Sequence, residues 1–198
     1  MTQEWYNKFI SEGGEDKRYD YKLDSDSLVF DVGGYQGDFA QRIYDTYKCW
    51  VFIFEPVPTF YDSIVARFAN NKKVKVFPFG VSNITTKLYM SLDGDKSSLY
   101  GGDKNVISVN VKSMADVLAD EGLCQVDLLK INIEGDEYPL LRHMLDDDLV
   151  KTFDNVQIQF HDFVMYADAQ RKAITTRLHK THDIQWCYDF VWESWRLR

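Results

Sequence analysis

Apolar residues recur along the chain in short continuous runs, separated by segments of mixed polarity. The runs are rich in valine, isoleucine, leucine and phenylalanine, which is typical of strands buried on both faces of a parallel sheet. They occupy residues 28–32, 50–54, 74–79, 126–133 and 156–160. Runs of this kind predict a sheet whose strands are mostly parallel.

Between these runs the spacing of apolar residues changes to that of a helix. Phe39, Ile43 and Tyr47 lie four positions apart and therefore share one face of a helix, and the segment 60–68 repeats this spacing. Ser113 precedes Asp116 by three residues, which predicts a capped helix start. The alternation of strands with helices predicts an α/β domain.

Three segments depart from this alternation. Residues 85–111 contain two short β-rich runs and predict a β-hairpin excursion, and the β-rich end of the chain at 184–195 predicts an antiparallel pair of strands. The polar residues 1–27 are expected to form an N-terminal extension that packs on or near the active site. Residues 28–198 are then expected to form the domain itself.

Composition narrows the class of protein. With 198 residues, 45% of them hydrophobic, the chain can bury one core, so a single domain is expected. No apolar stretch approaches the roughly 20 residues that span a bilayer, and the N-terminus has no apolar signal region. We therefore expect a cytoplasmic protein without a membrane partner. The net charge of -8 disfavours a nucleic-acid partner and favours a small neutral or cationic ligand.

A glycine-rich turn follows the first predicted strand. Gly33, Gly34 and Gly37 stand between this strand and the helix of Phe39. Glycine lets the backbone approach a ligand closely, and a helix N-terminus attracts a carboxylate or a phosphate. Glu55 ends the next strand, 18 residues after Gly37, where an acidic side chain can bind the two ribose hydroxyls of an adenosine. The turn and this glutamate together predict a cofactor that contains adenosine.

Two classes of cofactor bind at such a turn. The dinucleotide fingerprint G-x-G-x-x-G fails here, because Tyr35 and Asp38 occupy its second and third glycine positions. Asp38 would repel a pyrophosphate, whereas Asp31 and Asp38 would attract the ammonium and sulfonium groups of S-adenosylmethionine. The residues favour this cofactor, with S-adenosylhomocysteine as its product. The alternatives are an NAD(P)-dependent oxidoreductase and a non-catalytic ligand-binding domain on the same fold.

Most of the chain, residues 28–163, resembles the FkbM-type family of class I S-adenosylmethionine-dependent methyltransferases. Four motifs carry the resemblance: D-V-G-G at 31–34, F-E-P at 54–56, G-V-S at 80–82 and L-K-I-N-I-E-G-D-E at 129–137. The last motif is the most specific. Members usually have an aspartate where this chain has Asn132, so a hydrogen-bonding role is expected there and a role that requires negative charge is not.

The resemblance implies a single Rossmann-like domain with a mostly parallel seven-stranded sheet, helices on both faces and an antiparallel last strand. It implies methyl transfer to a hydroxyl of a sugar, a polysaccharide or a related metabolite, so the partner would be a small-molecule or carbohydrate acceptor. It also implies which segments bind the cofactor. The residues concerned are Asp31, Gly33, Gly34, Tyr35, Gly37, Asp38, Phe39, Glu55, Pro56, Gly80, Val81, Ser82 and Asn132.

The expected catalytic residues follow the fourth and fifth runs, because ligands of open α/β sheets bind at the carboxyl ends of the strands. His161 directly follows the run at 156–160. Its ordinary pKa of about 6.5 would leave it mostly neutral at pH 7, so it is expected to act as the general base. Glu134 is expected to orient the substrate or the cofactor. Nearby carboxylates leave a magnesium-assisted reaction open, but we expect no metal.

Overall fold

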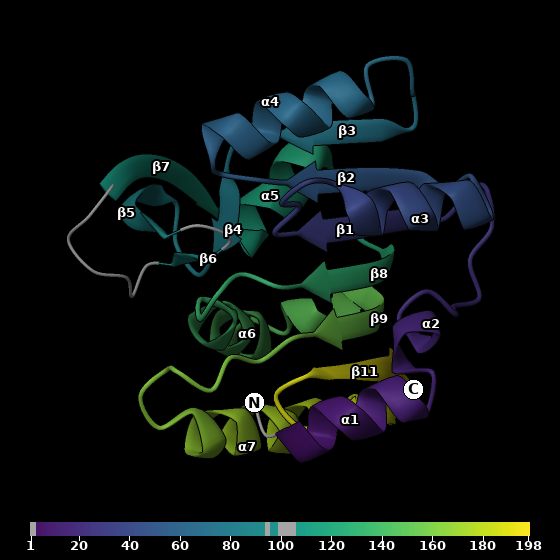
Figure 1. Cartoon of the computed structure of the whole chain (residues 1–198), viewed down its shortest axis with the longest axis vertical. Coiled ribbons are helices and arrows are strands. Elements are labelled where there is room, and N and C mark those ends of the chain that lie inside the picture. The colour runs from purple at the N-terminus through teal and green to yellow at the C-terminus, as the bar shows by residue number, and fades with distance from the viewer. Residues whose placement is uncertain (1–2, 94–95, 99–105) are drawn as a thin grey trace.

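A computed structural model describes residues 3–93, 96–98 and 106–198 of the chain. Seven strands form the main sheet in the order β10-β11-β9-β8-β1-β2-β3 (Figure 1). They are β1 (Leu28–Val32), β2 (Trp50–Phe54), β3 (Val74–Phe77), β8 (Val126–Ile131), β9 (Phe153–Ile158), β10 (His182–Tyr188) and β11 (Trp192–Leu197). β11 is antiparallel to both of its neighbours, and the remaining pairs are parallel. The expected seven-stranded sheet with an antiparallel last strand is confirmed.

Helices cover both faces of the main sheet, as expected. They are α3 (Asp38–Tyr47), α4 (Pro58–Arg67), α5 (Met114–Glu121), α6 (Glu137–Asp146) and α7 (Ala167–Leu178), with the 3-10 helix η1 (Leu149–Thr152) before β9. Successive side chains of a strand point to opposite faces of the sheet. Val29 accordingly belongs to the apolar cluster under α3 and α4, whereas Phe30 belongs to the cluster under α5, α6 and α7. This arrangement is the predicted Rossmann-like α/β fold.

A smaller sheet of order β4-β7-β5-β6 follows β3 along the chain (Figure 1). Its strands are β4 (Gly80–Ser82), β5 (Thr86–Asp93), β6 (Lys96–Ser98) and β7 (Val106–Ser113). β5 and β7 are antiparallel and occupy the segment in which a hairpin excursion is expected. Part of the predicted excursion, residues 94–95 and 99–105, lies outside the described residues. β4 follows β3 directly along the chain and pairs with β7, so it connects the smaller sheet to the end of β3.

The N-terminal segment packs at the edge of the main sheet that β10 and β11 form (Figure 1). It contains α1 (Gln3–Ser11) and α2 (Gly14–Lys17). Phe9 packs in an apolar cluster with Tyr188, Val191 and Trp192, because this packing removes their apolar surfaces from water. This packing attaches the N-terminal segment to the antiparallel end of the main sheet. No helix in the described part of the chain is both long and apolar enough to cross a membrane.

Candidate functional site

The carboxyl ends of β1, β2 and β8 meet at one edge of the main sheet and border a pocket of about 180 Å³. Residues of β4, β5 and β7 close the pocket on the side of the smaller sheet. The lining consists of Gly33, Tyr35, Glu55, Pro56, Val57, Phe60, Gly80, Val81, Met90, Val111, Asn132, Ile133, Glu134 and Asp136. The pocket thus lies at the carboxyl ends of parallel strands, where open α/β sheets bind ligands.

The glycine-rich turn brings two loops into direct backbone contact. Gly33 lines the pocket with a φ of 85°, and a Cβ at this position would lie 1.9 Å from the carbonyl oxygen of Asn132. A Cβ on Gly34 would lie 2.3 Å from Cγ2 of Ile53. Gly34 therefore serves the packing of the turn on β2, and Gly37 begins α3 as its N-cap residue with a φ of 81°. Neither of these two glycines lines the pocket.

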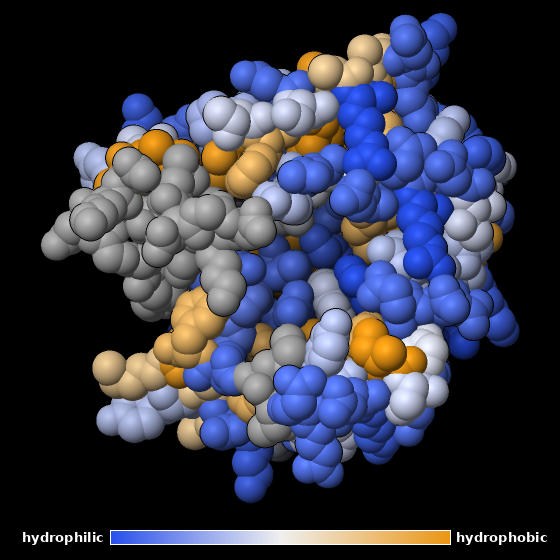
Figure 2. Space-filling view, in the orientation of Figure 1, coloured by the Kyte–Doolittle hydropathy of each residue, from blue (hydrophilic) through white to orange (hydrophobic). Residues whose placement is uncertain are grey.

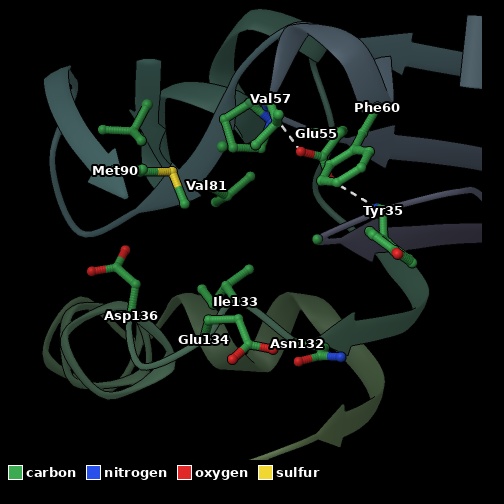
Figure 3. A pocket seen from close by; sticks show the side chains of 14 residues that line it. Tyr35, Glu55, Val57, Phe60, Val81, Met90, Asn132, Ile133, Glu134 and Asp136 are labelled. Carbon is green, nitrogen blue, oxygen red and sulfur yellow. Dashed lines mark hydrogen bonds between the residues drawn. The ribbon is translucent and has the colours of Figure 1, made fainter. Parts of the chain in front are cut away.

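Glu55 joins the turn to the end of β2 (Figure 3). Its Oε2 accepts a hydrogen bond from the backbone N–H of Tyr35 at 2.8 Å, and its Oε1 accepts one from that of Val57 at 2.9 Å. The residue is only 4% exposed, and this burial raises its pKa to about 7 although the two hydrogen bonds lower it. A carboxylate oxygen has two lone pairs, so Glu55 can also accept hydrogen bonds from ligand hydroxyls.

Asp31 lies beneath the turn and outside the pocket lining. It is fully buried, and its Oδ1 lies 2.8 Å from Nζ of Lys130. The same Nζ donates a hydrogen bond to the carbonyl oxygen of Gly33 at 2.7 Å. The sequence places Asp31 beside the ligand, but in the structure it neutralises the lysine that holds the turn. A buried charge is stable only beside an opposite charge, so the pairing with Lys130 keeps the side chain of Asp31 directed into the core.

Three further predicted residues also lie outside the lining. Asp38 is exposed and pairs with Arg67 at 2.5 Å, Phe39 is buried in the core under α3, and Ser82 is buried at the end of β4. A motif identifies the segment near a ligand, whereas the direction of each side chain depends on the packing of its element. The predicted residues that line the pocket are Gly33, Tyr35, Glu55, Pro56, Gly80, Val81, Asn132 and Glu134.

Sequence reasoning missed the remaining lining residues. They are Val57, Phe60, Met90, Val111, Ile133 and Asp136. Most of them are apolar, and an apolar residue near a strand end has the same pattern whether it faces the core or a ligand. Asp136 does carry a signal, because it lies in the motif at 129–137, but the start of a helix accounts for an aspartate there equally well.

A row of hydrogen-bonding groups links the loops that follow β8 and β9. Oε1 of the fully buried Glu137 accepts a hydrogen bond from the backbone N–H of His161 at 2.8 Å and lies 3.1 Å from its Nδ1. Nε2 of His161 lies 3.5 Å from Oε1 of Glu134. Glu134 has a φ of 50°, a left-handed backbone conformation that is strained for a residue other than glycine and recurs at functional sites.

His161 carries a positive charge in this row. Burial lowers the pKa of His161, but the hydrogen bonds and charges of Glu134 and Glu137 outweigh burial and raise the pKa to about 9. The imidazole is therefore protonated at pH 7. The sequence predicts a neutral histidine at this position, whereas in the structure carboxylates of a different loop face both ring nitrogens. No local pattern of the sequence indicates that contact.

The charges of the lining determine which ligands the pocket suits. The described lining residues include the carboxylates of Glu55, Glu134 and Asp136 and no lysine, arginine or histidine. Oδ1 of Asn132 is buried and has no hydrogen-bond partner within the described residues. A vacant acceptor among carboxylates fits the ammonium and sulfonium groups of S-adenosylmethionine better than the phosphates of a dinucleotide. No group of three His, Cys, Asp or Glu residues in the described ranges could hold a metal ion.

Comparison with known sequences extends over most of the chain. Residues 31–189 match the methyltransferase FkbM domain. No curated protein sequence matches the chain significantly.

Solved structures of low sequence identity share the fold. A putative rRNA methylase from Clostridium thermocellum is 9% identical, with 95% of this chain and 94% of that chain covered and a TM-score of 0.59. The fibrillarin pre-rRNA processing protein of Methanococcus jannaschii is 12% identical, with 90% of this chain and 69% of that chain covered and a TM-score of 0.55. At these identities the likeness extends to the fold alone.

Proposed function

The chain belongs to the FkbM family of S-adenosylmethionine-dependent methyltransferases, and we propose that it methylates a hydroxyl oxygen of a sugar, a polysaccharide or a related metabolite. The observation that carries this proposal is the position of Glu134, whose side chain lines the pocket and lies beside His161. A hydroxyl loses its proton when it is methylated, and a carboxylate at this position can accept that proton.

The ends of β1, β2 and β8 bind the cofactor in this proposal. Glu55 accepts hydrogen bonds from the ribose hydroxyls, and Oδ1 of Asn132 accepts one from the ammonium group of the methionine part. Gly33 allows the backbone to approach this part closely. When bound, S-adenosylmethionine supplies an electrophilic methyl group on a positively charged sulfur. The carboxylates of the lining stabilise that positive charge.

Glu134 is the general base in this proposal, and His161 is the residue that holds it. A protonated imidazole cannot accept a proton from the acceptor, but its Nε2–H can donate a hydrogen bond to Oε1 of Glu134. Glu137 holds the other side of the imidazole ring through Nδ1. A general base contributes about 10²- to 10⁴-fold to the rate, so the positioning of the two substrates supplies the larger share.

The loop between β9 and α7 offers a surface for the acceptor. Phe163, Met165 and Tyr166 are 51%, 73% and 77% exposed, and the ring of Phe163 lies 5.3 Å from that of His161. Apolar atoms gather at the lower left of Figure 2, where this loop lies in Figure 1. Exposed apolar side chains beside a polar site mark a binding surface. A sugar matches this surface because it offers C–H faces to the rings and hydroxyls to Glu134.

The charge of the molecule distinguishes this acceptor from RNA. The structural neighbours named above include proteins whose names refer to ribosomal RNA. Binding of a polyanion is driven by lysine and arginine side chains that neutralise its phosphates. This chain has a net charge of -8 and a pocket lined by carboxylates, so it favours a neutral acceptor.

The test combines binding with transfer of a labelled methyl group. Calorimetry with S-adenosylhomocysteine is expected to show binding, and Glu55→Ala is expected to weaken it by about 1 to 3 kcal/mol through the loss of the ribose hydrogen bonds. Label from S-adenosylmethionine is expected on hydroxyls within a panel of saccharides and other hydroxyl compounds. Transfer to nitrogen, carbon or RNA alone would contradict the proposed acceptor.

Two further outcomes would identify the alternatives. Binding of S-adenosylhomocysteine without transfer to any acceptor favours a non-catalytic ligand-binding domain. A rise in melting temperature with NAD(P) and none with S-adenosylhomocysteine favours an oxidoreductase. The fit of the pocket to a cationic cofactor argues against this last outcome.

A further inference from the structure

A second cavity, of about 670 Å³, lies at the opposite edge of the main sheet from the cofactor pocket. Its lining includes Asp127 and Asn155, near the starts of β8 and β9, and Arg196, near the end of the antiparallel β11. The arrows of β8 and β9 in Figure 1 point away from this edge. Residues 17–22 of the N-terminal segment contribute the outer wall. The proposed methyl transfer makes no use of this cavity.

The sheet side of the second cavity is a row of polar residues. Trp195 belongs to the apolar cluster under α5, α6 and α7, so the neighbouring Ser194 and Arg196 point to the other face of the sheet. On the adjacent β9, Gln157 is the register partner of Ser194, and Asn155 is that of Arg196. Of these four polar residues, Asn155, Ser194 and Arg196 line the cavity. Two paired strands therefore present polar groups to it.

One member of this row is a buried donor without an acceptor. Gln157 is fully buried, and its Oε1 accepts a hydrogen bond from the hydroxyl of Tyr21 at 2.8 Å. Its Nε2 has no hydrogen-bond partner within the described residues. The hydroxyl of Tyr21 also lies 3.1 Å from Oγ of Ser194, and both of these residues line the cavity. Packing alone does not account for the row, because apolar side chains of similar size would avoid the unpaired amide.

The charges around the second cavity are nearly balanced. The described lining contains four lysine and arginine side chains and three aspartates. Two of the cations pair with carboxylates outside the lining, whereas Lys22 and Arg196 form no ion pair within the described residues. An anionic ligand would meet the aspartates, and a cationic ligand would meet the lysines and arginines. A hydroxyl group both donates and accepts hydrogen bonds, so an uncharged ligand rich in hydroxyls suits this lining best.

Trp186 supplies an aromatic surface to the same cavity. It is partly buried, and its ring lies 6.2 Å from that of Tyr188. An aromatic side chain offers an apolar face to a ligand at little cost in conformational freedom. A sugar ring has C–H groups that pack on such a face and hydroxyls that reach the polar row. The lining therefore matches the two kinds of surface that a saccharide presents.

We propose that the second cavity binds an uncharged saccharide, at a distance from the site of methyl transfer. Asp127 lines this cavity and Asn132 lines the cofactor pocket. Five residues of extended chain separate them by about 17 Å, because a strand rises about 3.3 Å per residue. A sugar unit in the cavity therefore does not reach the transferred methyl group. The site does not depend on the proposed function, and binding there can be measured without the cofactor.

The test measures binding of the whole chain to an array of neutral, carboxylated and sulfated oligosaccharides, with no S-adenosylmethionine present. The chain is expected to bind neutral members of the array. Arg196→Ala is expected to weaken this binding about tenfold, the loss that follows from one hydrogen bond to a charged group. Trp186→Ala is expected to weaken it as well. Since Trp186 also packs near Tyr188, thermal unfolding checks that this variant is folded, whereas the exposed Arg196 is expected to leave the melting temperature unchanged.

Matched controls are available for both substitutions. Trp50 and Arg142 are exposed and line neither cavity, so Trp50→Ala and Arg142→Ala are expected to bind as the wild type does. Binding of no neutral oligosaccharide by the wild type would overturn the proposal, and so would binding of charged members alone. Neutral binding that neither Arg196→Ala nor Trp186→Ala weakens would place the saccharide elsewhere and would also overturn it. None of these outcomes affects the proposed function, which is tested by S-adenosylhomocysteine binding and by transfer of the label.

Discussion

Glu137 and His161 are joined through a single oxygen atom, because Oε1 of Glu137 lies 2.8 Å from the backbone nitrogen and 3.1 Å from Nδ1 of His161. Oε2 of the same carboxylate accepts the backbone N–H of Gly135 at 2.8 Å. One buried carboxylate therefore fixes the loops after β8 and β9 relative to each other. The position of Glu134 in the pocket depends on both loops, so the geometry of the proposed base depends on Glu137.

Glu137→Ala is expected to destabilise the fold strongly. The substitution leaves the backbone N–H groups of Gly135 and His161 and the Nδ1 of His161 without their acceptor, and each buried donor without an acceptor typically costs about 1 to 3 kcal/mol of unfolding free energy. Urea denaturation measures this loss. Asp45→Ala is the control, because Asp45 pairs with Lys48 on the surface and such pairs contribute about 1 kcal/mol or less. Equal effects of the two substitutions would contradict the role of Glu137.

The stability of the folded state is expected to fall as the pH rises above neutrality. The pKa of His161 is about 9 in the folded chain, against an ordinary value of about 6.5, so the folded state binds this proton more tightly than the unfolded state does. The resulting stabilisation is complete below pH 6.5, amounts to roughly 3 kcal/mol and is lost as the pH rises through 9. Urea denaturation from pH 6 to 10 should show a steeper decline for the wild type than for His161→Gln. If the unfolding free energies of the wild type and of His161→Gln declined in parallel, another residue would bind this proton.

Substitutions at Glu134 and His161 separate the base from the residue that holds it. Glu134→Gln is expected to lower kcat about 10²- to 10⁴-fold, because an amide cannot accept the hydroxyl proton, while the affinity for S-adenosylhomocysteine changes little. His161→Gln keeps an N–H donor near Glu134 and should retain more activity than His161→Ala. If His161 were the base, both of its variants would lose activity equally.

Gly33→Ala is expected to destabilise the chain through a clash as well as through its backbone conformation. The new Cβ would lie 1.9 Å from the carbonyl oxygen of Asn132, so the loops after β1 and β8 would have to separate. Gly122 is a matched control, since its φ of 65° is also left-handed and a Cβ there would have no neighbour within 4 Å. Gly122→Ala should cost about 1 kcal/mol and Gly33→Ala clearly more, as measured by thermal or urea unfolding.

The fold was predictable because its signals are local. The continuous apolar runs and the four-residue spacings indicate which faces are buried. In the structure these faces form the two apolar clusters on either side of the main sheet, one with Val29 and the other with Phe30. The turn at Gly33 and the acid at Glu55 were predictable for a similar reason. Both lie at strand ends at a spacing that the βα unit fixes, and both line the pocket.

The properties that sequence reasoning missed depend on contacts between distant segments. The motif predicts that Asp31 lies beside the ligand. In the structure its side chain points away from the pocket, because it pairs with Lys130 of β8, a strand far along the chain. The charge of His161 depends on two carboxylates of another loop. Met90 reaches the pocket from the smaller sheet, whose position relative to the main sheet no local pattern specifies.

Strand β8 connects the two halves of the proposed reaction site. Lys130, near its end, donates to the carbonyl oxygen of Gly33 and so holds the turn on the donor side. Asn132 and Glu134 follow within four residues and face the pocket. A shift of this short segment would therefore move the turn that holds the donor and the side chain of the proposed base in the same direction. One continuous stretch of backbone thus contributes to both sides of the substrate alignment.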